Sequence, residues 1–282
     1  MHLAPVLLSG LMLPGLMAPG LMAQTAPAAP ATAPAAQSSA NQEFLTSAAK
    51  LYYSTSKAGL NSFQCSVHRD WHAILAAGAK GAAVAPDDRR VTLLNSVSMV
   101  LHAKLKGGST LDWNAPTPAK PLDADSVALL DRMHQASDQT LQGFLQFWTP
   151  FVDGSVIPES PEGVDIAATD KGHILHADQG NTSLTEVFDT GNILKEFNVV
   201  MSGAKINFSP VYKSTDKGLL VNGFQAKVLP AGVPAELSQD INVVVDYQDV
   251  GGFPVPQSIQ MDVVGTGKLD FTLDHCAVNP AQ

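Results

Sequence analysis

Residues 96–106 show the most regular alternation of apolar and polar side chains in the chain. Val97, Met99, Leu101, Ala103 and Leu105 share one parity, and most residues of the other parity are polar or charged. Successive side chains of a strand point to opposite faces, so this pattern predicts a half-buried antiparallel strand. Gly107 and Gly108 predict a turn after it, and Leu111 and Trp113 then lie on the returning strand.

The stretch SFQCSVH, residues 62–68, alternates in the same way. Phe63, Cys65 and Val67 occupy its apolar parity. This predicts an early strand with Cys65 on the buried face. The following DWHAILAAG is expected to form a short helix, and residues 80–90 are expected to form a loop.

The whole chain from residue 164 to residue 278 is patterned as strands. The predicted strands cover residues 164–169, 173–177, 183–188, 193–201, 205–208, 219–228, 241–247, 258–263 and 268–275. Turn signals rich in glycine, aspartate and serine separate them. Because no helix-length pattern lies between these strands, an antiparallel meander is favoured over a parallel sheet.

Two other stretches carry apolar residues at helical spacing. The first helix is predicted from Leu45, Ala48, Ala49 and Tyr52, with Ser39 and Gln42 resembling a capping box and Gly59 marking its end. The second covers residues 123–148, where Asp123 or Asp125 can cap the start. Its apolar face contains Leu130, Met133, Leu141, Phe144 and Trp148. Both helices are expected to bury these faces against the concave side of the sheet.

The N-terminal segment is apolar from Leu3 to Ala23 and contains no Asp, Glu, Lys or Arg, and three prolines and three glycines interrupt it. A membrane-spanning helix needs about 20 uninterrupted residues. The segment therefore predicts a secretory signal peptide that is cleaved after Ala23, with an uncleaved anchor as the alternative. Residues 24–40 are an uncharged Ala/Pro/Ser/Gln tract and predict a disordered tether. One domain is expected to occupy residues 41–282.

The chain carries a formal net charge of −9. An acidic surface disfavours binding to nucleic acid and to anionic membrane faces. Together with the leader, this predicts a periplasmic or secreted protein that has no stable membrane span after signal removal.

The two cysteines, Cys65 and Cys276, lie near the two ends of the predicted domain. An even number of cysteines in an exported chain predicts a disulfide, and two residues are too few for a closed zinc site. The disulfide would join the first strand to the last, and two buried free thiols are the alternative. Leu269, Phe271 and Leu273 form the inward set of the last strand, so Cys276 requires a bulge near His275.

No segment carries the spacing of a known catalytic or metal site. His68 and His72 are four residues apart, but Arg69 stands where a helical zinc protease has its glutamate. His173 and His176 would point to opposite faces of a strand. No nucleophile elbow, phosphate-binding loop or dinucleotide-binding fingerprint occurs. We therefore expect no enzyme activity, no metal and no cofactor, and an unrecognised hydrolase is kept as a remote alternative.

Two stretches of the C-terminal half carry a family resemblance: LKEFNVVMSGAKINFSPVYKSTDKGLLVNGFQAKVLP and INVVVDYQDVGGFPVPQSIQMDVV. Their long successive strands, with a tyrosine-containing strand that passes through Gly and Pro into the next, are similar to those of LolA/LppX-type periplasmic carriers of lipoproteins and lipids. The resemblance implies an α+β fold in which a strongly curved antiparallel sheet, an incomplete barrel, surrounds helices and leaves an apolar cavity. The Arg-Pro signature of the lipoprotein carriers is absent, and Arg69, Arg89 and Arg90 stand in other contexts, so no functional residue is carried over.

The functional expectation follows from this architecture. The protein is predicted to bind or carry an acyl chain or another apolar ligand, with a lipid or a lipidated protein as its partner. The candidate ligand-lining residues, each equally suited to an ordinary core, are Phe144, Trp148, Phe197, Val199, Phe208 and Phe224. The alternative is a ligand-free structural or interaction protein of the cell envelope.

Overall fold

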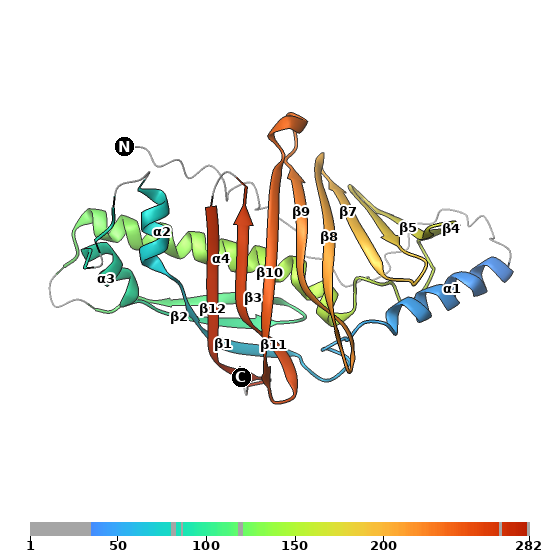
Figure 1. The fold of residues 1–282 in the computed structure, drawn as a ribbon, viewed down its shortest axis with the longest axis horizontal. Helices are drawn as coiled ribbons and strands as arrows, with labels where there is room; N and C mark the ends of the chain where they lie inside the picture. Colours follow the sequence, from blue (N-terminus) through green and yellow to red (C-terminus); the bar gives the residue numbers. More distant parts are fainter. Residues whose placement is uncertain (1–34, 80–82, 86, 118–120, 265–266, 281–282) are drawn as a thin grey trace.

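The computed structural model describes residues 35–79, 83–85, 87–117, 121–264 and 267–280 (Figure 1). The predicted signal peptide, residues 1–23, and residues 24–34 of the predicted tether lie outside this part of the chain.

Within the described residues, twelve strands form one antiparallel sheet in the order β3-β2-β1-β12-β11-β10-β9-β8-β7-β6-β5-β4. The strands are β1 Ser62–His68, β2 Ser98–Lys104, β3 Gly108–Asn114, β4 Asp165–Thr169, β5 Gly172–Gln179, β6 Thr182–Phe188, β7 Leu194–Met201, β8 Ala204–Thr215, β9 Gly218–Leu229, β10 Gln239–Val250, β11 Phe253–Val263 and β12 Gly267–Val278. The sheet is not closed into a barrel, because β3 and β4 form its two separate edges. This confirms the predicted α+β fold with a curved antiparallel sheet.

Each predicted strand is present, but several are longer than expected. β8 continues to Thr215 although prediction ended it at residue 208, and β11 begins at Phe253 rather than at residue 258. The extra residues include Pro210, Pro254 and Pro256, which break the alternating pattern that marks a strand in the sequence. β-Bulges accompany them, at Val211/Tyr212 and at Asp246/Tyr247.

The helices are α1 Ala35–Ala49, α2 Trp71–Gly78, α3 Arg89–Asn95 and α4 Ala124–Asp153, and Ala235–Leu237 forms a single 3-10 turn, η1. Helix α4 has 30 residues and is therefore roughly 45 Å long. The side chain of Asp123 caps its start by accepting a hydrogen bond of 2.8 Å from the backbone N–H of Ser126, as predicted. The helix ends at Gly154, which adopts a left-handed conformation with φ 82°.

Four predictions about the helices and the segments beside them are wrong in detail. Helix α1 begins at Ala35, so the tether prediction does not hold from that residue on, and Ser39 lies inside the helix rather than at its cap. Tyr52 lies beyond the end of α1, where it forms an isolated bridge with Leu219. Residues 89–90, predicted as loop, begin α3, because Asp88 caps the helix and Val91 and Leu94 are buried.

The helices cover the sheet in separate places. Figure 1 shows α4 running behind the central strands, with α1 at the β4–β7 end and α2 and α3 near the start of α4. The exit of α1 is held on the β8–β9 hairpin by backbone hydrogen bonds, Tyr53 N to Leu219 O at 2.9 Å and Leu219 N to Leu51 O at 2.7 Å. Gly218 allows this close approach, since a Cβ there would lie 2.8 Å from Leu51 O.

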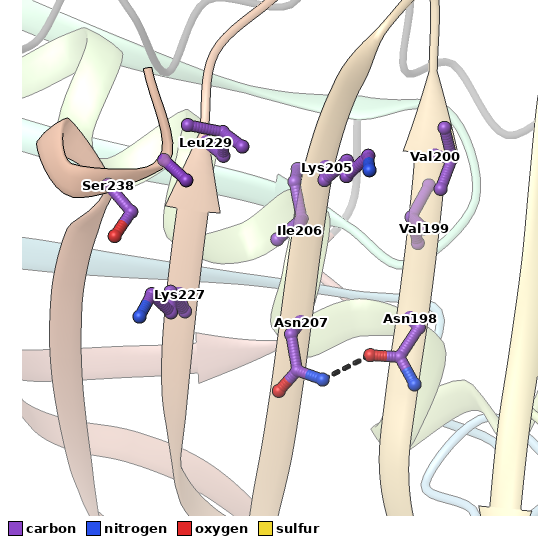
Figure 2. A pocket seen from close by; sticks show the side chains of 10 residues that line it. Asn198, Val199, Val200, Lys205, Ile206, Asn207, Lys227, Leu229 and Ser238 are labelled. Atoms are coloured by element: carbon purple, nitrogen blue, oxygen red, sulfur yellow. Dashed lines mark hydrogen bonds between the residues drawn. The ribbon is translucent and has the colours of Figure 1, made fainter. Parts of the chain in front are cut away.

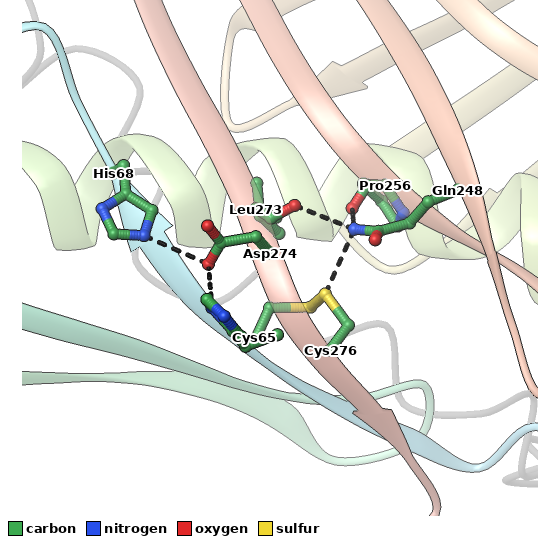
Figure 3. Close-up of a disulfide and its surroundings, with 8 residues drawn as sticks. Cys65, His68, Gln248, Pro256, Leu273, Asp274 and Cys276 are labelled. Carbon is green, nitrogen blue, oxygen red and sulfur yellow. Dashed lines mark hydrogen bonds and ion pairs between the residues drawn. A yellow bond between two sulfur atoms is a disulfide. The ribbon is translucent and has the colours of Figure 1, made fainter.

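Cys65 and Cys276 form the predicted disulfide, with an S–S distance of 2.05 Å (Figure 3). It joins β1 to β12, the seam at which the first three strands meet the C-terminal meander. Gln64 lies opposite Ala277 and Ser66 opposite Asp274, so Cys65 faces the extra residues of a bulge that includes His275 with φ 46°. The bulge expected from residue parity is therefore present, and the disulfide pairing is confirmed.

Candidate functional site

The concave face of the sheet meets α4 through aromatic side chains. The centroid of the Phe147 ring on α4 lies 4.6 Å from that of the Phe208 ring on β8. The ring centroids of Phe151 on α4 and Phe197 on β7 are 6.1 Å apart. The Phe208 ring also contacts Phe224 on β9, at a centroid distance of 5.5 Å. A layer of aromatic rings therefore separates the C-terminal half of α4 from the backbone of the sheet.

Five of the six predicted lining residues belong to this interior, and Val199 is buried outside it. Phe144, Trp148, Val199, Phe208 and Phe224 are buried, and Phe197 is half-buried against them. The inward parity of the strands, which the sequence left open, is the one that contains these residues, since Phe197 pairs with Phe208 and Val199 with Ile206. The structure brings five of the six together as packed side chains, whereas Val199 is buried outside that cluster and also borders a surface hollow.

In the described part of the chain, two surface pockets lie mainly on the opposite, outer face of the same strands. One, of about 330 Å³, is lined by outward residues such as Val200, Lys205, Asn207 and Lys227, and also by Val199 and Ile206 of the buried parity (Figure 2). The other, of about 260 Å³, adjoins it through Asn207 and Lys227 and extends to Asp240 on β10. Neither hollow lies between α4 and the sheet, where the sequence predicted an apolar cavity.

The C-terminal half of α4 is anchored to the middle of the sheet by a buried polar chain. The indole Nε1 of Trp148 donates a 2.7 Å hydrogen bond to the hydroxyl of Tyr247 on β10, which in turn donates to the carbonyl of Val221 on β9. Burial raises the pKa of Tyr247. Thr55 adds a further hydrogen bond of 3.0 Å to the carbonyl of Val152 at the end of the helix. Every polar group of this anchor has a partner, so the contact is stable in a dry interior.

Strand β1 runs beneath α4 and links its two halves. The ring of Phe63, near the start of the strand, contacts Trp148 at a centroid distance of 6.1 Å. Arg69 follows the last residue of β1, and its Nη1 donates a 2.9 Å hydrogen bond to the hydroxyl of Ser137 on α4. That hydroxyl donates onward to the carbonyl of Met133 at 2.7 Å. Arg69 therefore connects the end of β1 to the N-terminal half of the helix.

The guanidinium of Arg69 lies between aromatic rings rather than beside a carboxylate. It stands 4.4 Å from the ring centroid of Phe271 on β12 and 5.0 Å from that of Trp71 on α2. Its Nε is buried and has no hydrogen-bond partner among the described residues. Burial lowers the pKa of Arg69 to about 10, and the negative charge of Asp270 opposes this shift only through space.

Sequence reasoning assigned no role to Arg69, although its parity carries a signal. Phe63, Cys65 and Val67 point inward, and Arg69 occupies the next position of the same parity. The capping of α2 by Asp70, which accepts a 2.9 Å hydrogen bond from the backbone N–H of Ala73, turns the chain directly after this residue. The sequence therefore offered one signal that Arg69 is buried, because this charged residue continues an inward-facing series.

A second buried charged residue lies beneath the other end of the sheet. Glu186 on β6 is 1 % exposed, and its Oε2 has no partner among the described residues. Burial raises the pKa of Glu186 well above its usual range. The hydroxyl of Tyr212 on β8 is also buried, and its ring packs edge-on against that of Tyr52 at a centroid distance of 5.3 Å. The Tyr52 hydroxyl accepts a 2.7 Å hydrogen bond from the backbone N–H of Leu194.

The histidines singled out in the sequence are separated by the fold. His68 pairs with Asp274 at 3.1 Å, and His72 contacts the carbonyl of Val84 at 2.9 Å. His173 stacks on Phe44 of α1 at 4.0 Å, and His176 contacts Thr185 at 3.1 Å. In the described residues, no three His, Cys, Asp or Glu side chains are grouped in a way that could hold a metal ion. Among the described helices, none is both long enough and apolar enough to cross a membrane.

The fold and the site thus define an α+β protein with an open, helix-covered antiparallel sheet and one disulfide at its seam. No family model, curated protein or solved structure matches the chain. The similarity to LolA/LppX-type carriers therefore stays a prediction from the residues.

Proposed function

We propose that the protein is an exported carrier that shelters an acyl chain, or a similarly apolar ligand, between the concave face of the sheet and α4. The observation that carries this proposal is the unequal attachment of α4. Its C-terminal half is held by fully paired contacts, whereas its N-terminal half receives a hydrogen bond from Arg69, whose buried Nε has no partner among the described residues.

The physical argument concerns what happens when the N-terminal half of α4 moves outward. Its apolar face includes the buried Leu129 and Leu130 and the half-buried Met133, and the facing side of the sheet includes Leu101, Phe271 and Leu273. An acyl chain inserted between these surfaces would replace helix contacts with its own methylenes. Each buried methylene is worth about 0.8 kcal/mol, so a chain of ordinary length offsets the lost contacts. No catalytic residue is needed for such binding.

The proposed location is the periplasm or the extracellular space, and the proposed partner is a lipid or a lipidated protein. The apolar leader supports export. The disulfide supports it as well, since such bonds persist in oxidising compartments.

Native mass spectrometry with lipid extraction tests the proposal, on protein purified from the envelope of its own host. We expect a co-purifying lipid that Ala136→Trp displaces, because Ala136 is half-buried on α4 one residue from Ser137. Ala128→Trp, on the exposed side of the same helix, is the matched control and should retain the lipid. A protein that carries no lipid in any preparation would contradict the proposal.

A second candidate is a ligand-free envelope protein that acts through its outer face. The ring-to-ring packing of Phe147, Phe208 and Phe224 favours it, because these side chains fill the interior without a ligand. The hollows on the outer face favour it too. The same mass spectra separate the two candidates, since this one predicts a protein that is always free of lipid.

A further inference from the structure

The arginines of this chain differ in how their charges are matched. Arg89 pairs with Asp123 at 3.0 Å and Arg90 with Asp88 at 2.6 Å, both on the exposed surface. Arg132, also exposed, donates a 3.2 Å hydrogen bond to the carbonyl of Ala128. Arg69 is the most buried of them, yet its charge has no carboxylate within ion-pair distance among the described residues. Desolvation makes a counter-ion most necessary for the most buried charge, yet here the exposed Arg89 and Arg90 have carboxylate partners and Arg69 does not.

A buried cation without a counter-ion is unfavourable, and folded proteins usually pair such a group or leave it in water. The Ser137 hydroxyl accepts one hydrogen bond, and a guanidinium has five N–H donors. The π faces of Phe271 and Trp71 attract the charge but accept no conventional hydrogen bond. The remaining donors, including the buried Nε, therefore have capacity for a further acceptor.

We propose that Arg69 binds the anionic head group of the acyl ligand, a carboxylate or a phosphate, at the junction of β1, β12 and α4. This inference rests on the proposed carrier function and adds the chemical class of the ligand. A guanidinium presents a planar fork that matches both anions in a two-point contact. The residue is half-buried rather than fully enclosed, so a head group can reach it from the surface.

The surroundings of Arg69 suit an amphiphile rather than a free anion. Beyond Trp71 lies Trp113 on β3 at 6.0 Å, and the ring of His134 on α4 stacks on Trp113 at 5.1 Å. These rings flank the N-terminal half of α4, the part that the proposed function requires to move. A head group at Arg69 would release the Ser137 hydroxyl from its charged partner while the acyl chain extends under the helix. Head-group binding and helix displacement would then favour each other.

Equilibrium binding of three probes that share one oleoyl chain tests the proposal. Oleic acid carries a carboxylate, oleoyl-lysophosphatidic acid a phosphate, and 1-monooleoylglycerol a neutral head. We expect the full chain to bind at least one of the two anionic probes at least about tenfold more tightly than the neutral one. Tighter binding of oleic acid would identify a carboxylate head, and tighter binding of the lysophosphatidic acid a phosphate head; either supports the proposal.

The variants separate recognition by Arg69 from general effects on folding. Arg69→Gln should bind all three probes with similar affinity, and Arg69→Lys should keep part of the preference because it keeps the charge. Arg132→Gln, which removes an exposed arginine from the same helix that Arg69 contacts, should keep the whole preference. High salt should weaken anionic binding to the unaltered protein and leave 1-monooleoylglycerol unaffected.

The possible failures are distinguishable. If the three probes bind the unaltered protein equally, Arg69 is a structural contact and the head-group proposal is overturned, while the carrier function stands. The same conclusion follows if Arg69→Gln keeps the preference for an anionic head. If none of the probes binds, the carrier function itself is contradicted, and this inference fails with it.

Discussion

The two halves of α4 meet the sheet in different ways. The C-terminal half places Trp148 against Phe63 and Tyr247, and each polar group of that contact has a partner. At the N-terminal half, Arg69 contacts Ser137, and the buried Nε of this arginine has no partner among the described residues. A folding core has no use for an unpaired buried charge, whereas a site that must open and bind does. The difference indicates that the C-terminal half supports the fold and that the N-terminal half is the place to look for function.

Substitution of Trp148 should have the largest effect. Trp148→Ala removes a buried ring and leaves Tyr247 with one partner fewer, so we expect a loss of about 4 kcal/mol in the free energy of unfolding. Trp113→Ala, a half-buried tryptophan beside the N-terminal half of α4, should lose less than half as much. Urea unfolding measures both changes. Equal losses would remove the distinction between the two halves.

The disulfide fixes strand β1, which contacts the C-terminal half of α4 through Phe63 and leads into Arg69 at the N-terminal half. Replacing Cys65 and Cys276 together by alanine should lower the free energy of unfolding by about 3 kcal/mol, since a very long loop is no longer closed in the unfolded chain. Chemical reduction of the unaltered protein should give the same loss. Non-reducing mass spectrometry after thiol alkylation checks the starting point, because two alkylated thiols in the native, air-exposed protein would refute the pairing.

Glu186 extends the comparison to the β4–β7 end of the sheet. Its pKa is raised in the folded protein, so below about pH 4.5 the carboxyl is protonated in both folded and unfolded chains. Above that pH the unfolded chain loses the proton first, and stability falls until the folded pKa is reached, with a slope of at most about 1.4 kcal/mol per pH unit. Tyr52 and Tyr212, whose pKa values burial also raises, are the other titratable groups that sense this charge.

Urea midpoints measured between pH 5 and pH 8 test this dependence. Glu186→Gln should flatten the decline and should be the more stable protein at the alkaline end. Glu196→Gln, on an exposed position of the neighbouring strand β7, is the matched control and should leave the decline unchanged. A stability that is independent of pH in the unaltered protein would show that Glu186 is solvated rather than buried.

The smallest expected effect concerns the Arg69 contact itself. Arg69→Met keeps the length of the side chain and removes the unpaired charge, so its free energy of unfolding should stay within about 1 kcal/mol of the unaltered protein or rise. Ser137→Ala keeps the charge and removes its hydrogen-bond partner, which should cost about 1–2 kcal/mol. Thermal unfolding ranks the two variants. If Arg69→Met were much the less stable, the arginine would be a structural anchor like Trp148.

Local patterns predicted most of the secondary structure, because alternation and turn residues act over a few positions. The strands from residue 164 onward, the capping of α4 by Asp123 and the inward face of that helix were all readable in this way. Helix α3 was missed because its seven residues bury only Val91 and Leu94, too few for a periodic signal. The early start of α1 was missed because the Ala/Pro-rich composition before Asn41 indicated a tether.

For the candidate site, the sequence alone left open which face of strands β7–β9 points inward, but it determined which residues of each strand share a face and that a Cys65–Cys276 bond requires a bulge. Parity is a property of one strand, and it needs no knowledge of neighbours. Only the tertiary structure decided that Phe147 and Phe208 touch, that Glu186 is sealed beneath the sheet, and that Arg69 reaches Ser137 with no carboxylate at ion-pair distance in the described part of the chain. These facts depend on contacts between segments far apart in the chain, and burial and charge pairing exist only once those segments are packed together.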